Sequence, residues 1–300
     1  MCKVLNIQRS AYYKWLNRAI PENEQENMEL AETIKKYHQK YGGILGYRRM
    51  RMFINRNYKK NYNIKRIRRI MNILGIHSRL RRIKTGCTVS NKADQKAENI
   101  LHRDFEASAP NEKWTTDVTE FKVPHSTEKL YLSVFLDLYD RCIIAWEIRE
   151  RNDNILVQNT FRKAVAQNPE AHPLFHSDRG YQYTSPVFQN QLKEHGMIQS
   201  MSRVACCLDN GPTEGLWGII KTEMYKMYEI YDKESLIEAI GNYINFYNYQ
   251  RYQERYNSKA PMEIRMEAMN TVKPKQYPIA FNLRIAKYHE LLNNLKTQSE

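Results

Sequence analysis

Hydrophobic residues in the first quarter of the chain recur with the period of a helix. A helix that begins near Glu24 is predicted by four apolar side chains spaced four, three and four residues apart: Leu30, Ile34, Tyr37 and Tyr41. After a Gly-rich break, a second helix is predicted over 47–57 and a third over 64–74. An Asn-containing turn supplies an N-cap for the third helix, and Gly75 ends it.

From residue 113 onward the pattern changes to the alternation that is typical of strands. Three strands are predicted over 113–119, 130–138 and 142–148. The remaining pattern predicts a helix over 154–166, a strand over 174–176, a helix over 185–194, a strand over 197–200, and helices from about Pro212 and about Glu234. Three strands followed by alternating helices and strands predict a mixed α/β sheet flanked by helices, an order that resembles the ribonuclease H-like fold.

Charge divides the chain into two parts. The net charge is +14, and residues 1–110 hold 24 Lys and Arg against 9 Asp and Glu, whereas the rest is nearly neutral. Between Thr33 and Ala93 there are 18 basic residues and no acidic one. A solvated surface normally mixes both signs, so this segment favours a polyanionic partner, nucleic acid before an anionic membrane. A basic face without function is the alternative.

A helix, a short turn and a basic helix form the helix-turn-helix arrangement. We therefore expect the helix over 64–74 to lie in the major groove of double-stranded DNA. The candidate DNA-binding side chains of this region are Arg48, Arg49, Lys65, Arg66, Arg68 and Arg69.

No pattern in the sequence marks a membrane span or a secretion signal. The longest apolar stretch, 131–136, ends at Asp137, far short of the roughly 20 residues that a span requires. Five cysteines without a CxxC pair fit a reducing compartment better than a disulfide framework. We expect a cytoplasmic protein without membrane contact.

Three acidic residues occupy positions that suit a metal site. Asp117 lies within a predicted strand, Asp178 follows another strand, and Glu214 lies in the first turn of a helix, with 35 residues between the last two. Carboxylates from three elements can converge on hard divalent cations, whose preferred ligands are oxygens. Two such ions can activate a water on one side of a phosphodiester and stabilise the leaving oxygen on the other.

Spacing alone leaves other interpretations open. Asp117 could pair with a lysine, Asp178 could be a turn residue, and Glu214 could interact only with the helix dipole. Three further acids are rival ligands: Asp137, Asp140 and Asp209. Asp209 or Asn210 could also serve simply as a helix cap.

Several ordered motifs identify a family resemblance. They are Trp114-Thr-Thr-Asp117-Val-Thr119, Leu130 to Asp137, His176-Ser-Asp178-Arg-Gly-Tyr-Gln-Tyr-Thr-Ser185, Cys207-Leu-Asp-Asn-Gly-Pro-Thr-Glu214, Tyr47-Arg-Arg-Met50, Lys65 to Met71, and Cys2 to Tyr13. Together they resemble the OrfB-type transposase of bacterial insertion sequences, the family numbered three, whose catalytic core is similar to that of retroviral integrases. The resemblance covers about residues 2 to 265.

The resemblance implies that Asp117, Asp178 and Glu214 are the catalytic, metal-binding DDE triad, with Mg²⁺ or Mn²⁺ as cofactor and two ions per site. It also implies a basic residue seven positions after the glutamate, where Lys221 stands, able to reach a phosphate of bound DNA. Where many members carry Ser-Phe-Phe-Gly, this chain has Gly215-Leu-Trp-Gly218, so Trp217 is either a core aromatic or a stacking surface.

The activity implied is cleavage of phosphodiesters at the element ends and strand transfer of the freed 3′-hydroxyl into target DNA. The expected partners are DNA of the element ends and target, further copies of the chain on that DNA, and an upstream OrfA protein or fusion. The alternative function is a non-catalytic DNA-binding regulator or decayed remnant. We expect a helical DNA-binding domain over 1–83, a polar linker over 84–105, a catalytic core over 106–265, and a tail of unknown role over 266–300, in a protein associated with the bacterial nucleoid.

Overall fold

A computed structural model describes residues 2–80, 98–203 and 206–297. The chain divides into a helical unit that ends at Arg79 and a sheet unit that begins at Leu80. Most of the predicted linker, 84–97, lies outside the described residues. Its last residues, 98–105, pack within the sheet unit, where Leu101 and Phe105 are buried.

Four helices form the helical unit. They are α1 (Arg9–Leu16), α2 (Glu22–Lys40), α3 (Tyr47–Asn57) and α4 (Ile64–Ile73). The predicted apolar stripe of α2 is buried, together with Phe53 of α3 and Ile67 of α4. The Asn63 side chain accepts a hydrogen bond from the Lys65 backbone N–H and so caps α4, and Gly75 takes the positive φ that follows this helix. The three predicted helices are therefore confirmed.

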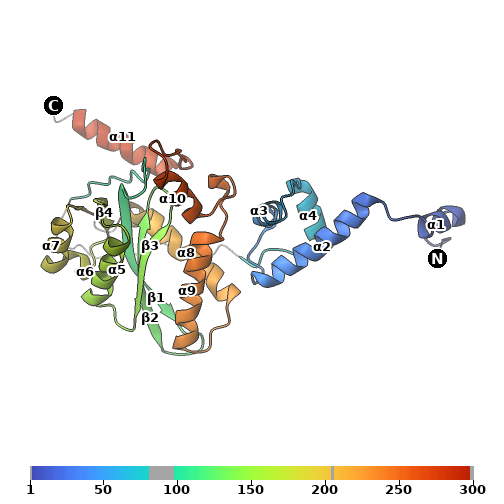
Figure 1. The fold of residues 1–300 in the computed structure, drawn as a ribbon, viewed down its shortest axis with the longest axis horizontal. Coiled ribbons are helices and arrows are strands. Elements are labelled where there is room, and N and C mark those ends of the chain that lie inside the picture. The colour runs from blue at the N-terminus through green and yellow to red at the C-terminus, as the bar shows by residue number, and fades with distance from the viewer. Residues whose placement is uncertain (1, 81–97, 204–205, 298–300) are drawn as a thin grey trace. The chain divides into compact units, whose positions relative to one another are not determined.

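A five-stranded sheet forms the centre of the sheet unit (Figure 1). Its strands are β1 (Lys113–Lys122), β2 (Lys129–Asp137), β3 (Ile143–Arg149), β4 (Leu174–Ser177) and β5 (Ile198–Met201). Their order in the sheet is β3-β2-β1-β4-β5. The first three strands pair antiparallel as a meander, whereas β4 pairs parallel with both β1 and β5. The predicted mixed sheet is confirmed.

Helices cover both faces of this sheet. The sheet unit contains α5 (Asn154–Gln167), α6 (Tyr181–Thr184), α7 (Pro186–Glu194), the short 3₁₀ helix η1 (Cys207–Asn210), α8 (Gly211–Met227), α9 (Lys233–Tyr249), η2 (Glu254–Tyr256), α10 (Pro261–Met269) and α11 (Leu283–Thr297). Figure 1 shows α5, α6 and α7 on one side of the strands and α8 and α9 on the other. Helices α1, α10 and α11 were not among the predicted elements.

Alternation along β1 divides its side chains between the two helical layers. Trp114 belongs to the apolar core beneath α5 and α7, and the Thr116 hydroxyl lies 3.1 Å from that of Tyr183 on the same side. Thr115 and Asp117 contact residues of α8 on the opposite side. A carboxylate in the central strand therefore faces a helix that follows it by about 100 positions in the chain.

Among the described residues, no helix combines the length and the apolar character that a bilayer span demands.

Candidate active site

The pairing of two parallel strands brings Asp117 and Asp178 to neighbouring positions. In the register of β1 with β4, Thr115 stands opposite His176. Continuing that register by two residues places Asp117 beside Asp178, which directly follows β4. The Gly180 backbone N–H donates to Oδ1 of Asp178 at 2.9 Å and holds the carboxylate at this turn. Asp178 thus lies at the carboxyl end of its strand, where α/β sheets commonly bind ligands.

Side-chain hydrogen bonds fix the first turn of α8 against β1. The Asn210 amide donates to the Thr116 carbonyl oxygen at 2.9 Å, and the Thr213 hydroxyl lies 2.9 Å from that of Thr115. Asn210 is the N-cap residue of α8, but its side chain makes no capping bond. Asn210 thus stands at the helix cap that the sequence suggested, but its side chain bonds to β1 instead of to the helix backbone. The bonds to β1 bring Glu214, in the first turn of α8, to the face of the sheet that bears Asp117.

Trp217 is the principal contact between α8 and Asp117. Its indole N–H donates to Oδ2 of Asp117 at 3.0 Å, and the Val118 backbone N–H donates to Oδ1 at 2.8 Å. Trp217 is buried, as the core interpretation expected, but it also serves as a hydrogen-bond donor. Only a weak signal of this role is present in the sequence, a Trp three positions after Glu214 in the same predicted helix.

Burial and mutual repulsion disfavour the charged forms of these carboxylates. Burial, the largest cause, and the charges of Asp178 and Glu214 together raise the pKa of Asp117 to about 7, although the hydrogen bonds from Trp217 and Val118 act to lower it. Burial also raises the pKa values of Asp178 and Glu214. Clusters of carboxylates with raised pKa values are typical of sites that hold cations or exchange protons.

No Lys or Arg of the described chain forms an ion pair with Asp117, Asp178 or Glu214. The three rival acids differ in this respect, because each is fully buried and bonded to arginine. Arg265 donates to both Asp137 and Asp140 at 3.0 Å. Each rival therefore has an arginine partner within the fold, whereas the candidate triad has none. Asp137 and Asp140 share a single arginine, and burial together with the charge of Asp137 raises the pKa of Asp140 to about 7.

Asp209 is bound by two arginines. Its Oδ1 accepts from Arg103 at 2.7 Å and from Arg203 at 2.9 Å, and its Oδ2 accepts from Asn99 at 2.8 Å. Burial acts to raise its pKa, but the Arg203 and Arg103 bonds outweigh burial and lower the pKa to about 2. Asp209 is thus a structural anion, and its predicted roles as a metal ligand or helix cap are not supported by its contacts.

The chemistry of the donor set fits a hard divalent cation, because all three candidate ligands are carboxylates without a cationic partner. Within the described ranges, no group of three or more His, Cys, Asp and Glu side chains is close enough to hold a metal ion. In this conformation Oδ2 of Asp117 faces the Trp217 indole. Coordination of one ion by all three carboxylates thus requires a conformation other than this one.

Lys221 lies on the Asp117 side of α8. Its Nζ is 5.3 Å from the centroid of the Phe121 ring, and its side chain is half-buried. Burial lowers its pKa, while the charges of Glu120 and Asp117 act to raise it. The sequence-predicted lysine therefore stands within electrostatic reach of the predicted metal ligand.

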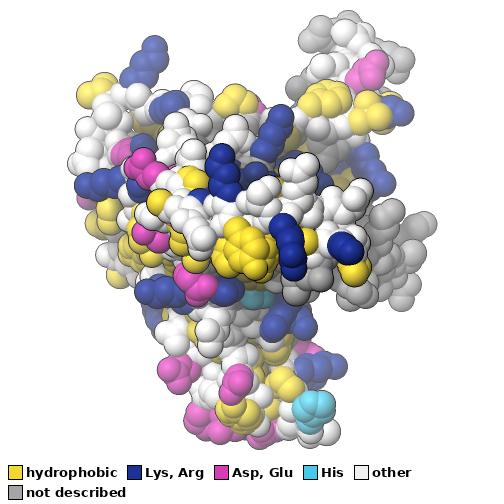
Figure 2. Space-filling model, turned by 90° about the vertical axis from the view of Figure 1, so that its right-hand side faces the viewer, with side chains coloured by type: hydrophobic (Ala, Val, Ile, Leu, Met, Phe, Trp, Pro, Cys, Tyr) yellow, Lys and Arg dark blue, Asp and Glu magenta, His cyan; other side chains and the backbone are white. Residues whose placement is uncertain are grey.

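The basic residues of the helical unit differ in what they contact. Lys65, Arg68 and Arg69 of α4 are exposed, as is Arg48 of α3, while Arg49 is half-buried. Arg66 instead bonds to Glu26 at 2.7 Å and to Asn27 at 2.9 Å, both on α2. Figure 2 shows Lys and Arg side chains spread through the middle of the face turned to the viewer.

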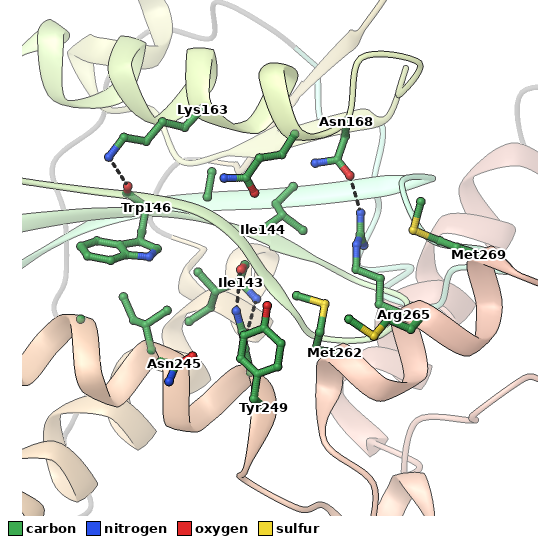
Figure 3. A pocket seen from close by; sticks show the side chains of 16 residues that line it. Ile143, Ile144, Trp146, Lys163, Asn168, Asn245, Tyr249, Met262, Arg265 and Met269 are labelled. Atoms are coloured by element: carbon green, nitrogen blue, oxygen red, sulfur yellow. Dashed lines mark hydrogen bonds between the residues drawn. The ribbon is translucent and has the colours of Figure 1, made fainter.

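A cavity of about 750 Å³ lies away from the three carboxylates, between edge strand β3 and helices α5, α9 and α10 (Figure 3). Trp146, Tyr249 and Met262 line it, and the Lys163 ammonium donates to the Trp146 carbonyl oxygen at its rim. Arg265 reaches from this cavity to Asn168 at 2.7 Å. None of the candidate triad residues contributes to the lining.

Comparisons with known proteins agree with this architecture. The integrase core domain family matches residues 107–207, a second integrase core model matches 214–269, and an HTH-like domain matches 22–84. The InsK protein of insertion sequence element IS150 from Escherichia coli (strain K12), named as a transposase, is 35% identical over 266 residues, which cover 88% of this chain and 92% of InsK. This chain belongs to the OrfB-type transposases of bacterial insertion sequences.

Other members and solved structures extend the comparison. A transposase-like protein of Haemophilus influenzae is 39% identical to this OrfB-type chain over 210 residues, covering 69% of this chain and 95% of the relative. Among solved structures, the HTLV-2 integrase catalytic core in complex with magnesium aligns with 22% identity and a TM-score of 0.42, covering 52% of this chain and 97% of that one. The sheet unit of this family member has the ribonuclease H-like architecture expected from its element order.

Proposed function

We propose that this transposase cleaves phosphodiesters at the ends of its insertion sequence and joins the freed 3′-hydroxyl to target DNA, using Mg²⁺ or Mn²⁺. Asp117, Asp178 and Glu214 are the catalytic residues and metal ligands of this proposal. The observation that carries it is the contrast between these three carboxylates, which have no cationic partner in the described chain, and their three rivals, which are all bonded to arginine.

The charge at the site supports the choice of cofactor. Repulsion from Asp178 and Glu214 raises the pKa of Asp117, so the site gains stability when a cation binds among the three groups. Two bound divalent ions supply activation of the attacking oxygen and stabilisation of the leaving oxygen. The chain itself contributes the carboxylates, and the Trp217 bond orients Asp117 toward α8.

DNA is held by separate basic groups in this proposal. Lys221 contacts a phosphate of the bound element end, because its ammonium lies on the side of α8 that faces Asp117. Exposed cations of the helical unit, such as Arg68 and Arg69, contact the DNA backbone. Assembly of several copies on DNA and cooperation with an OrfA segment remain part of the proposal.

The test is incubation of the purified protein with labelled duplexes of its own element ends and Mg²⁺ or Mn²⁺, both as the isolated chain and as an OrfA fusion. We expect nicked and joined strands. The Asp178→Asn variant should lose both products and keep or improve DNA binding, because it removes a metal ligand and a negative charge. Glu170→Gln, which alters an exposed acid, is the matched control.

Each outcome has a defined meaning. Joined product that disappears in Asp178→Asn supports the transposase and its metal site. Nicked strands without joined ones indicate a nuclease of the same fold. Tight binding without any product, in the chain and in the fusion alike, indicates the DNA-binding regulator or decayed copy. Normal joining by Asp178→Asn refutes the triad.

A further inference from the structure

Two arginines lie close to the aromatic ring of Tyr288. Tyr288 lies on α11, in the tail to which the sequence assigns no role, and its side chain is buried. The guanidinium carbon of Arg103 is 4.3 Å from the ring centroid, and that of Arg203 is 4.1 Å from it. Both distances lie well inside the roughly 6 Å limit of a cation–π contact. The structure thus contains two such contacts on one ring.

The same two arginines bind the carboxylate of Asp209. Arg203 donates to Asp209 from its backbone N–H and from its guanidinium, and Arg103 adds a third link at 2.7 Å. Two guanidinium charges against one carboxylate leave an excess of positive charge beside the buried Asp209, where the Arg103 side chain is 10% exposed and that of Arg203 is 34% exposed. The electron-rich faces of Tyr288 offset this excess, because ring faces carry negative potential. Removal of the ring would take away both cation–π contacts that offset the repulsion between the two guanidinium groups.

Asp209 is linked directly to the candidate active site. It lies in η1, which runs without a break into α8. The next residue, Asn210, bonds to the β1 carbonyl of Thr116, and Thr213 contacts Thr115. Glu214 follows immediately. The position of Asp209 therefore sets where the first turn of α8 meets the central strand.

We propose that α11 is a positioning helix for the active site, in which Tyr288 holds the Asp209 arginine pair and thereby fixes Glu214 relative to Asp117. Tyr288 does not touch the reacting groups and is a positioning residue, as are Arg103 and Arg203. This proposal rests on the proposed function, since it assigns Glu214 to the metal site. Two further contacts dock α11 in the same place: the His289 ring nitrogen lies 2.8 Å from the His102 carbonyl oxygen, and Ile285 packs on the cluster of Leu101 and Phe105.

The experiment compares three variants of the full chain. Tyr288→Leu keeps apolar volume but removes the ring, whereas Tyr288→Phe keeps the ring and removes only the hydroxyl. Phe281→Leu, an exposed position two residues before α11, is the control for a change of ring to leucine. Amide hydrogen exchange is followed by mass spectrometry without metal, and strand transfer is measured over a range of Mg²⁺ concentrations.

For Tyr288→Leu we expect about tenfold faster exchange over 206–217, the size of effect that loss of buried cation–π contacts produces. Exchange in β2 should be unchanged, and half-maximal strand transfer should need several-fold more Mg²⁺. Tyr288→Phe and Phe281→Leu should match the parent protein in both measurements.

The proposal is overturned if Tyr288→Leu leaves exchange over 206–217 unchanged, or if Tyr288→Phe is equally damaging. Faster exchange throughout the sheet also overturns it, because α11 is then a general stabiliser. If the parent protein joins no DNA, the proposed function fails by itself, and the exchange measurement still decides whether Tyr288 positions α8.

Discussion

The indole nitrogen of Trp217 lies 3.0 Å from Oδ2 of Asp117, so the first turns of α8 are bonded directly to the central strand of the sheet. This bond favours the ionised carboxylate and partly opposes the burial and repulsion that raise the pKa of Asp117 to about 7. Trp217 therefore helps determine the pH above which Asp117 carries a charge.

Trp217→Phe should move the acid limb of the pH–rate profile to higher pH. The variant removes the donor, so the pKa of Asp117 rises further, by about one unit if a hydrogen bond to a charged group is lost. The measurement is strand transfer against pH at fixed Mg²⁺. Trp146→Phe, a tryptophan on β3 remote from the carboxylates, is the control. An unchanged limb, or one shifted to lower pH, would show that the bond does not tune Asp117.

Asp117→Asn should change how stability depends on pH in the absence of metal. The pKa of Asp117 is higher in the folded protein than in the unfolded chain, so its contribution to stability is present at low pH and is lost as pH rises from about 4 to about 7. The free energy of unfolding of the variant, measured relative to that of the parent, should therefore rise by about 2–4 kcal/mol between pH 4 and pH 8.

Denaturant unfolding of the parent and of Asp117→Asn at pH 4 and at pH 8 measures this change in relative stability. Mg²⁺ should then stabilise the parent and not the variant, because a ligand stabilises only the fold that binds it. A parent protein whose unfolding is indifferent to millimolar Mg²⁺ in the absence of DNA would contradict metal binding by these carboxylates in the free protein.

Arginines on neighbouring turns of α4 should behave differently when replaced. Arg68→Ala and Arg69→Ala should each weaken DNA binding and reduce the slope of log K against log salt by about one. Arg66→Ala should instead lower the free energy of unfolding by about 1 kcal/mol, because Arg66 is bonded to Glu26 and Asn27. Binding titrations at several salt concentrations separate the two classes. Equal salt slopes for all three variants would show that Arg68 and Arg69 do not contact the DNA backbone.

Asp209 should make the fold sensitive to acid. Its pKa in the folded protein is lowered to about 2, so its stabilising contribution is present above about pH 4 and is lost as pH falls toward 2. Asp209→Asn should therefore lower the free energy of unfolding by about 2 kcal/mol or more at pH 7 and by much less near pH 2. Chemical denaturation at both pH values measures this, with Glu170→Gln at an exposed position as control. A cost that does not depend on pH would mean that packing, and not charge, determines the effect.

Periodicity predicted the elements that have one clear apolar face. The alternation around Trp114 and Val118 marked β1, because its apolar residues face one helical layer while Thr115 and Asp117 face the other. The stripe from Leu30 to Tyr41 marked α2, which buries one face. Helix α10 buries one face, but two of the four residues on that face are Pro261 and Arg265, so its apolar period is weak in the sequence, and α1 buries no residue at all. Helix α11 is held mainly by single contacts such as that of Tyr288.

The roles of individual charged residues were harder to predict. Arg66 looks like its neighbours in the sequence, and only the fold brings Glu26 beside it from 40 positions away. The distinction between Asp117 and rivals such as Asp137 likewise depends on Arg265, more than 100 residues later. Spacing suggested a set of candidate carboxylates, but the tertiary partners of each carboxylate decide which of them stay uncompensated.

The parallel pairing of β1 with β4 also determines when the three carboxylates can come together during translation of the chain. Asp117 and Asp178 become neighbours only after β2, β3 and α5 have been made, and Glu214 comes later still. The helical unit precedes all of them and consists of local contacts that form quickly. A chain whose translation stops before α8 therefore contains the DNA-binding half of the proposed enzyme without its full triad. Such a fragment would compete with complete copies for the same DNA and would make no breaks in it.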